Sequence, residues 1–128
     1  MPEYMLLIYT PADNPLTPEE MAEMSPKWDE YTESLREAGV YVAGDALQST
    51  ELATTVRERD GQVQITDGPF AETKEVLGGY YVLNAPDLDT VITHAGRIPN
   101  IAYGSTEIRP ILSMTARQSR AAGAQASA

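Results

Sequence analysis

The residues best suited to chemistry in this sequence form a nine-residue motif, Asp67 to Glu75, between two strand-like segments. The motif contains a turn signal, one aromatic ring, one lysine and three carboxylates. Lys74 could bind an anionic substrate or, if burial lowered its pKa, act as a base. The alternative is a solvated charged loop, because structural ion pairs also occur beside strands. We predict a loop in which Phe70, Glu72 and Lys74 are the candidates for ligand contact.

The first three residues of the motif predict a turn. Asp67 can accept a hydrogen bond from a nearby backbone N–H, Gly68 permits unusual dihedral angles, and Pro69 fixes φ and removes a donor. Because the chain must leave a strand here, turn formation is the favoured role of Asp67. Ligand contact is the alternative, since loops on a rigid sheet present their side chains for binding.

The only histidine, His94, has the one side chain that titrates near pH 7 without perturbation. Its helical angle places it at the flank of an apolar helix stripe, which favours a surface position over a catalytic one. The sequence contains no HxxxH, HxH or cysteine pattern. We therefore expect neither a metal site nor a cofactor.

Composition limits the classes of protein to which the chain can belong. A length of 128 residues with 42% hydrophobic content predicts one domain. The net charge of -10 opposes binding to nucleic acid or to an anionic membrane surface. The absence of cysteine excludes disulfides, thiolate nucleophiles and iron–sulfur clusters. The N-terminal apolar run is too short for a signal segment or a membrane span, so we expect a cytoplasmic protein.

The elements that must position these residues begin with a strand over residues 3–9, which is apolar on both faces. Thr17 starts a capping box with proline at the first helical position, and Gly39 is suited to end this helix. Residues 40–47 read as a second strand, interrupted by Gly44. The helix carries its apolar residues at spacings of three and four, and these include Met21, Met24, Trp28, Tyr31 and Leu35.

A hairpin and another strand follow. Asp60-Gly61 lies between residues 54–59 and 62–66 and is the strongest hairpin signal in the chain. Residues 76–83 form a strand whose glycine pair permits close approach of a ligand or another backbone. The tyrosines at 80 and 81 should point to opposite faces of the sheet.

The last elements are a helix, a strand and a tail. Asp87 can cap a helix that Pro99 stops, and residues 103–112 supply a final strand. The tail, residues 113–128, is rich in Ala, Ser, Gly and Gln, and we expect it to be mobile. The apolar stripe of the helix consists of Leu88, Val91, Ile92, Ala95 and Ile98.

This order predicts an α+β fold of the ferredoxin-like βαββαβ type with an extra β-hairpin, in one domain over residues 1–112. Two helices can cover only one face of such a sheet, yet two of the main strands are apolar on both faces. Burial of apolar area contributes about 25 cal/mol per Å², so a second copy should cover the other face. We predict a homodimer with its sheets facing each other.

Several segments together resemble the YCII-related proteins, in the branch with the DGPF motif, from about Tyr4 to Pro110. The resemblance implies a dimeric α+β barrel of ferredoxin-like subunits with a cleft between them. It brings no settled function. The segments that carry it are Tyr4 to Tyr9, Leu35 to Val40, Ala43-Gly44, Asp67 to Glu75, Leu77 to Tyr81, Gly104-Ser105 and Glu107 to Pro110.

The resemblance implies two different kinds of role. Some relatives are described as enzymes with a histidine and an acid in the cleft, and one is a dehydrochlorinase acting on a hydroxylated aromatic. Proteins of the DGPF branch are often encoded near extracytoplasmic-function sigma factors, which suggests a regulatory role. This chain departs from the first pattern, because Trp28 stands where shorter relatives carry histidine, and tryptophan cannot exchange protons near neutral pH. Asp45 remains a candidate for the same cleft.

Three hypotheses follow. The first is a small-molecule cleft at the homodimer interface, binding or catalytic, and Arg109 joins it as a partner for a carboxylate or a substrate anion. The second is an accessory or regulatory protein that binds a protein partner. The third is a lyase or isomerase acting on a hydroxylated ring, with Asp45 or Lys74 as the candidate base. The complete predicted cleft consists of Asp45, Asp67, Phe70, Glu72, Lys74 and Arg109.

Overall fold

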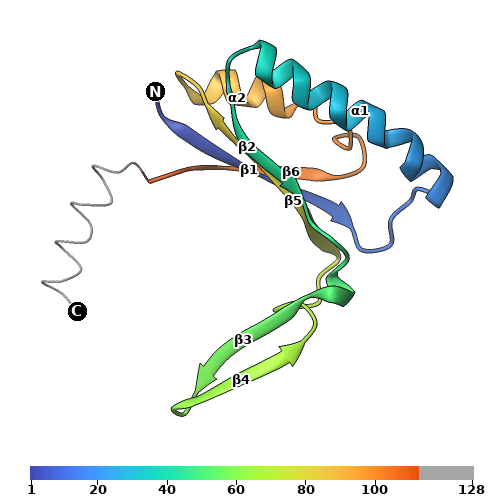
Figure 1. Cartoon of the computed structure of the whole chain (residues 1–128), viewed down its shortest axis with the longest axis vertical. Helices are drawn as coiled ribbons and strands as arrows, with labels where there is room; N and C mark the ends of the chain where they lie inside the picture. Colours follow the sequence, from blue (N-terminus) through green and yellow to red (C-terminus); the bar gives the residue numbers. More distant parts are fainter. Residues whose placement is uncertain (113–128) are drawn as a thin grey trace, which may run out of the picture.

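The computed structural model describes residues 1–112, and the tail predicted to be mobile lies outside the described residues. Two helices lie on one side of the main sheet, and a hairpin extends away on the other (Figure 1). The elements are β1 (Glu3–Pro11), α1 (Pro18–Glu37), β2 (Tyr41–Ala46), the short 3-10 helix η1 (Thr50–Leu52), β3 (Thr54–Arg59), β4 (Gln62–Asp67), β5 (Glu75–Asn84), α2 (Leu88–Ala95) and β6 (Ser105–Pro110).

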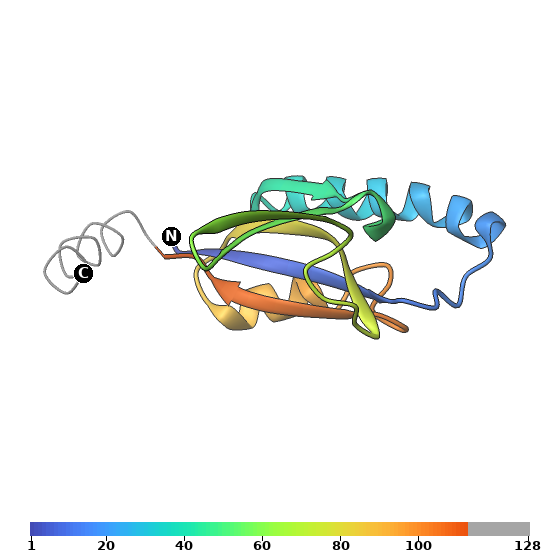
Figure 2. The ribbon, with the colours of Figure 1, turned by 90° about the horizontal axis from the view of Figure 1, so that it is seen from below.

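The main sheet has four strands in the order β2-β5-β1-β6, and each neighbouring pair is antiparallel. Figure 2 shows β1 and β6 running side by side, with α2 behind β6 in this view. The two central strands are β1 and β5. They are the first and third strands of the βαββαβ order when the extra hairpin, β3 and β4, is left out of the count. This arrangement confirms the predicted ferredoxin-like α+β fold. The facing of two sheets in a dimer stays a prediction.

Helix α1 begins where the capping signal predicts. The Thr17 hydroxyl accepts a hydrogen bond from the Glu20 backbone N–H at 3.1 Å, and the Glu20 carboxylate accepts one from the Thr17 backbone N–H at 3.2 Å. Two N–H groups that the helix leaves without partners are thus satisfied. At the other end Ala38 is the C-cap, and Gly39 follows with φ +75°. Glycine adopts this left-handed conformation readily, so the chain can turn directly into β2.

The core lies between the helices and one face of the sheet. Alternate residues of β1 point into it, and Leu6 is fully buried there against Leu35 of α1 and Leu83 of β5. Strand alternation then places Met5 and Leu7 on the opposite face, where both are half-buried. The two faces of β1 are apolar, as predicted, but the helices cover only one of them.

Helix α2 differs from its prediction in length and in orientation. It ends at Ala95 with Gly96 as its C-cap, four residues before the predicted stop at Pro99. Its buried residues are Val91, His94 and Ala95, whereas Leu88 and Ile92 of the predicted stripe are about half exposed. The helix is therefore rotated from the expected orientation, and the predicted surface position of His94 is wrong.

The hairpin of β3 and β4 forms where Asp60-Gly61 predicts it. Both turn residues have positive φ, 53° for Asp60 and 75° for Gly61, as a type I′ turn requires. Its strands make a separate two-stranded sheet. One of its faces carries Val56, Val63 and Ile65, all more than 60% exposed. An isolated ribbon of this kind is marginally stable in water, so its exposed apolar face is a candidate for further contact.

Candidate functional site

A cavity of about 500 Å³ lies between the N-terminal half of α1 and the sheet. Its walls also include the loop before α1, the ends of β1, β2 and β5, and the loop between α2 and β6. Sites for small molecules typically have volumes of about 300–1,000 Å³. The cavity is therefore large enough to hold one.

The helix side of the cavity is a single face of α1. Its lining residues recur at spacings of three and four, which place them on one stripe of a helix. Met21, Met24 and Trp28 supply apolar and aromatic surface, and Trp28 and Met24 are half-buried. Ser25 and Asp29 add polar groups to the same stripe. Trp28 lines the cavity and also packs against the hydrophobic core.

Three glycines, Gly44, Gly78 and Gly79, line the sheet side of the cavity. A Cβ on Gly44 would lie 2.5 Å from the Tyr81 ring, and one on Gly79 would lie 2.9 Å from the backbone oxygen of Asp45. A Cβ on Gly78 would have no neighbour closer than Thr10 at 3.7 Å. The glycine pair predicted to permit a close approach does so at Gly79, where the strands pack closely, whereas a Cβ on Gly78 would make only ordinary van der Waals contacts.

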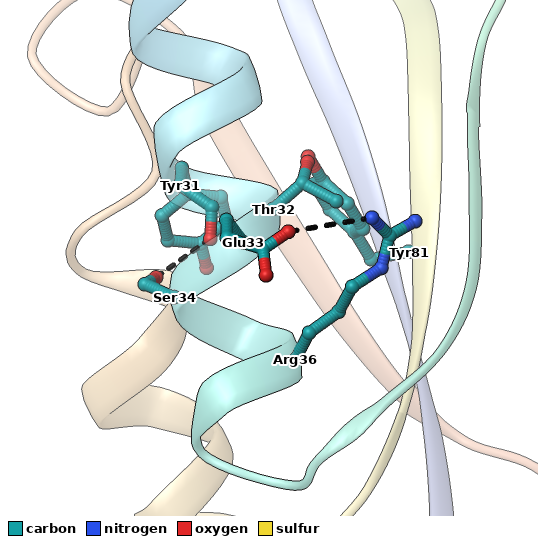
Figure 3. Close-up of polar contacts among 6 residues, drawn as sticks. All are labelled: Tyr31, Thr32, Glu33, Ser34, Arg36 and Tyr81. Carbon is teal, nitrogen blue, oxygen red and sulfur yellow. Dashed lines mark hydrogen bonds and ion pairs between the residues drawn. The ribbon is translucent and has the colours of Figure 1, made fainter.

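Tyr81 connects the sheet to α1 at the inner end of the cavity. Its hydroxyl and that of Thr32 are 2.6 Å apart, and its ring packs edge-on against Tyr31 at 5.6 Å between centroids (Figure 3). Burial raises the pKa of Tyr81, and the negative charges of Tyr41 and Asp29 raise it further when those groups are ionised.

Asn100 lies at the cavity wall, and its side-chain amide is buried beneath the surface. Its side chain is 2% exposed, and its Nδ2 donates to the Tyr9 carbonyl at 3.3 Å and to the Thr10 hydroxyl at 3.4 Å. Since the Tyr9 carbonyl can only accept, the amide nitrogen must face it, which fixes the orientation of the amide. The Oδ1 atom is buried and has no hydrogen-bond partner among residues 1–112. Such a group costs about 1–3 kcal/mol, so a donor at this position would stabilise the protein.

Asp45 contributes to the wall at the β2 side, but its carboxylate is engaged elsewhere. It accepts a hydrogen bond from the Tyr80 hydroxyl at 2.7 Å, and the two residues are directly opposite each other in the β2–β5 ladder. This hydrogen bond and the charge of Asp45 raise the pKa of Tyr80. Because Tyr81 points toward α1, Tyr80 and Asp45 lie on the open face of the sheet. The prediction that the two tyrosines take opposite faces is confirmed.

The structure does not bring the six predicted cleft residues together within one chain. Of these residues only Asp45 lines the cavity. Phe70 is 76% exposed, with the Arg57 guanidinium 5.2 Å from the centre of its ring. Glu72 and Lys74 are exposed in the loop before β5, and Arg109 is exposed on β6. Whether these residues meet those of a second copy stays a prediction.

The turn at Asp67-Gly68-Pro69 closes the base of the hairpin. The Gly68 backbone N–H donates to the Ala53 carbonyl at 2.7 Å, and the Thr55 hydroxyl donates to the Gly68 carbonyl at 2.8 Å. Gly68 has φ +113°, which glycine tolerates best. The predicted turn is present, but within residues 1–112 the Asp67 carboxylate makes no hydrogen bond to it. The backbone of the motif forms the turn, with no contribution from the acid.

His94 lies between the helices. Arg97 donates to its Nδ1 at 2.8 Å, and its backbone carbonyl accepts a hydrogen bond from the Tyr31 hydroxyl at 2.6 Å. Burial lowers the pKa of His94, and the positive charge of Arg97 lowers it further. The neutral ring with its hydrogen on Nε2 fits this arrangement. His94 therefore acts in helix packing, away from the cavity.

The described lining of the cavity contains few charges. Asp29 lines it and no Lys, Arg or His does, while the carboxylate of Asp45 faces the other side of the sheet. The Arg36 guanidinium lies 4.7 Å from the centre of the Tyr41 ring, which is part of the wall. Within residues 1–112 no group of three or more His, Cys, Asp or Glu side chains is arranged to hold a metal ion. No helix in that part of the chain is long and apolar enough to cross a membrane.

Fold and site together define a ferredoxin-like α+β protein with a cavity between its longer helix and its sheet. The family model of the YCII-related domain matches residues 3–115. The chain therefore belongs to the YCII-related family. The DGPF branch within that family stays a prediction.

The chain is also similar to an uncharacterised protein of Rhizobium meliloti (strain 1021), with 39% identity over 77 residues. The aligned region covers 59% of this chain and 62% of the relative, so the chain spans about three fifths of the length of that relative.

Two residues of the cavity were missed by sequence reasoning. Asp29 was hidden among the many acids of α1, and its place on the Met21–Met24–Trp28 stripe was the one available signal. Asn100 follows a proline in a loop, where nothing in the sequence distinguishes it from a solvent-exposed turn residue. Its burial results from the packing of the α2–β6 loop against the end of β1.

Proposed function

We propose that this protein binds a small molecule in the cavity beneath α1. The observation that carries the proposal is a cavity of suitable volume whose walls combine apolar, aromatic and polar side chains. The apolar and aromatic side chains of α1 provide the surface that such sites use for affinity. A few polar groups, among them Ser25 and Asp29, would fix the orientation of the ligand.

The single tryptophan makes the proposal directly testable. Trp28 lines the cavity, so its fluorescence should change when a ligand enters. A library of small molecules would be screened against the unaltered protein and against two variants, Ser25→Phe and Glu23→Phe. Ser25 lines the cavity and Glu23 does not, while both are exposed on α1. We expect compounds that bind the unaltered protein and Glu23→Phe but not Ser25→Phe. No binding at all, or equal binding to both variants, would refute the proposal.

We also propose that the open face of the sheet packs against a second copy of the chain. Met5 and Leu7 of β1 and Val82 of β5 are half-buried on this face, and Val42 of β2 is 45% exposed. The exposed apolar face of the hairpin adds a second surface that one chain leaves uncovered. Both surfaces are of the kind that marks an interface. The predicted cleft of motif residues and Arg109 would then form between the copies.

Sedimentation velocity tests this assembly. We expect a species of twice the 13.9 kDa mass of the chain. Met5→Glu should shift it toward the monomer, because a carboxylate would be buried without a partner in the apolar interface. Ala22→Glu, at an exposed position of α1, is the matched control and should leave the dimer intact. A monomer at all concentrations would exclude the dimer.

General acid–base catalysis is a second candidate function, favoured by the hydrogen bond between Tyr80 and Asp45. A hydroxyl and a carboxylate in contact can exchange a proton with a substrate at the open face. A screen of hydroxylated aromatic compounds for elimination or isomerisation would use Asp45→Asn and Tyr80→Phe. Loss of turnover in both variants would support this function, and turnover that survives both would remove it.

A further inference from the structure

The hairpin of β3 and β4 contributes nothing to the core of the chain. No residue of its two strands is buried, and no hairpin residue belongs to the described core. The two strands pair only with each other. A two-stranded ribbon is marginally stable by itself in water. A stable hairpin therefore implies a contact that a single chain does not supply.

The pairing register gives the hairpin two unlike faces. Val56 and Ile65 are directly opposite each other, and Val63 lies two residues from Ile65 on the same face. All three side chains are largely exposed, so they form one continuous apolar surface, the hairpin patch. Glu58, opposite Val63, and Asp67, at the base, border this patch. The other face consists of polar residues: Thr55, Arg57, Arg59, Gln62, Gln64 and Thr66.

The hairpin lies on the same side of the main sheet as the open face. Figure 1 shows it opposite the helices, and in the view from below it lies in front of the sheet (Figure 2). The chain enters the hairpin from the end of β2 and leaves it for the start of β5. A body that covers the open face would therefore lie beside the hairpin as well.

The size of the surfaces favours a second copy of the chain as that body. Specific interfaces bury about 800 Å² per partner, whereas the open face of four strands covers roughly 400 Å² at the usual strand spacing. Two sheets that only faced each other would thus bury about half of the usual area. The hairpin patch covers roughly 200 Å² and contributes twice, because each copy of a two-fold pair gives one and receives one. With both hairpins the interface reaches the usual size.

Charge directs the hairpin patch toward one strand of the second copy. Glu58 and Asp67 border the patch, so two such patches packed together would bring like charges into contact. Arg109 of β6 is the only lysine or arginine in the four strands of the main sheet. It is exposed on an edge strand and forms no ion pair within residues 1–112. Glu107 of the same strand is engaged by the Tyr9 hydroxyl at 3.5 Å.

We infer that the hairpin is a dimer arm whose apolar patch packs against β6 of a second copy, with its bordering acids facing the partner's Arg109. By two-fold symmetry the hairpin of the second copy makes the same contact in return. This inference rests on the proposed dimer and adds the element that clamps it and the strand on which the clamp closes.

Two replacements in one strand test the patch. Ile65→Thr removes apolar surface and keeps a β-branched side chain, while Gln64→Thr places the same residue on the opposite face. Sedimentation velocity over a range of concentrations gives the dissociation constant of each dimer. We expect Ile65→Thr to raise this constant by at least about tenfold, because a two-fold dimer loses the contact twice. Gln64→Thr should leave it unchanged.

A charge reversal tests the strand that receives the arm. Arg109→Glu would bring like charges together at both copies of the contact, so the dissociation constant should rise by about fivefold. Lys27→Glu makes the same reversal at an exposed position of α1 and is the matched control. It should leave the dimer as stable as that of the unaltered protein.

A photoreactive label locates the contact directly. Because the chain contains no cysteine, Val63→Cys can carry a single benzophenone maleimide, which inserts into nearby C–H bonds under light. A mixture of isotope-labelled and unlabelled chains separates links between copies from links within one chain. We expect the label to reach β6 of the other copy, and a label on Gln62→Cys, on the opposite face, to form far fewer links.

Three results would overturn the inference. These are equal dissociation constants for Ile65→Thr and Gln64→Thr, equal constants for Arg109→Glu and Lys27→Glu, or a Val63→Cys label that reaches only its own chain, the other hairpin or a helix. If a dimer is present in these experiments, the proposed assembly stands and only the arm is excluded. A monomer at every concentration would remove the assembly itself.

Discussion

Gly44→Ala should destabilise the protein strongly, because the space at this position is already filled by Tyr81. The new Cβ would lie 2.5 Å from Cδ1 and 2.9 Å from Cε1 of the ring, and 3.1 Å from the Tyr80 backbone oxygen. Carbon atoms in contact are normally about 3.5–4.0 Å apart, so the ring would have to move by about 1 Å. It is held by the hydroxyl of Thr32 and by edge contacts with Tyr31 and Tyr41.

The expected loss of stability follows from these contacts. Overpacking of a core typically costs about 1–3 kcal/mol, and loss of the hydrogen bond to Thr32 adds about 1 kcal/mol. Replacing a strand glycine by alanine returns about 0.4–1 kcal/mol by restricting the unfolded chain. The free energy of unfolding should therefore fall by about 2–3 kcal/mol. With a urea m-value of about 1.5 kcal/mol per M, the midpoint would move by about 1.5–2 M.

Urea denaturation followed by Trp28 fluorescence and by circular dichroism measures this change. Gly78→Ala is the matched control, since its Cβ would meet nothing closer than 3.7 Å, and it should be neutral or slightly stabilising. In a Tyr81→Val background, which has no δ or ε carbons, Gly44→Ala should lose most of its cost. Equal stability of Gly44→Ala and the unaltered protein would refute the argument. A cost that persists in the Tyr81→Val background would do the same.

Three further predictions concern local structure. Thr17→Ala should lower the free energy of unfolding by about 1 kcal/mol in urea denaturation, because α1 loses a capping hydrogen bond that Thr17→Ser would retain. Gly61→Ala should reduce amide-exchange protection in β3 and β4 but not in the main sheet, because φ at this position is +75° and the hairpin is a separate sheet. Burial depresses the pKa of His94 below 6.5, so its stabilising contribution is present above about pH 6.5 and is lost as the pH falls through the folded-state pKa. His94→Asn, which keeps an acceptor for Arg97, should remove this loss between about pH 7 and 5 in thermal melts.

Each of the three has a result that would contradict it. If Thr17→Ser and Thr17→Ala lowered the free energy of unfolding equally, the hydroxyl would not be the group that caps α1. Uniform loss of protection after Gly61→Ala would mean that the hairpin unfolds with the main sheet. An unchanged slope of stability against pH in His94→Asn would place the titration on other groups.

The fold could be predicted where the signals were local. Thr17 with Glu20, and Asp60 with Gly61, each specify their structure through hydrogen bonds or dihedral angles within a few residues. The element order then left few arrangements of the sheet, because sequential antiparallel strands and right-handed crossovers limit the topology. Tertiary packing decided the remainder. Helix α2 buries His94 because the His94 backbone carbonyl accepts a hydrogen bond from the Tyr31 hydroxyl, and Tyr31 lies 63 positions away in the sequence.

The candidate site was predictable only in part. Trp28 and the methionines of α1 form a regular apolar stripe, but periodicity cannot distinguish a stripe that fills a core from one that lines a cavity. The difference depends on the glycines of the facing strands, which place no side chain opposite the stripe, and on the loop of Asn100, which the end of β1 holds in place. Both are properties of the assembled sheet and loops, so no spacing in the sequence contains them.

The Asp67 to Glu75 motif carries the family resemblance, yet its side chains do not line the cavity. Its backbone contacts explain how the motif can matter to the site all the same. One end closes the hairpin at Gly68, and at the other the Lys74 carbonyl accepts a hydrogen bond from the Ala12 N–H at 2.7 Å. Ala12 begins the loop that carries Asn14 and Leu16 into the cavity wall. A motif can therefore be specific because it sets the path of the backbone around a site. Its side chains need not touch the ligand for its sequence to matter to binding.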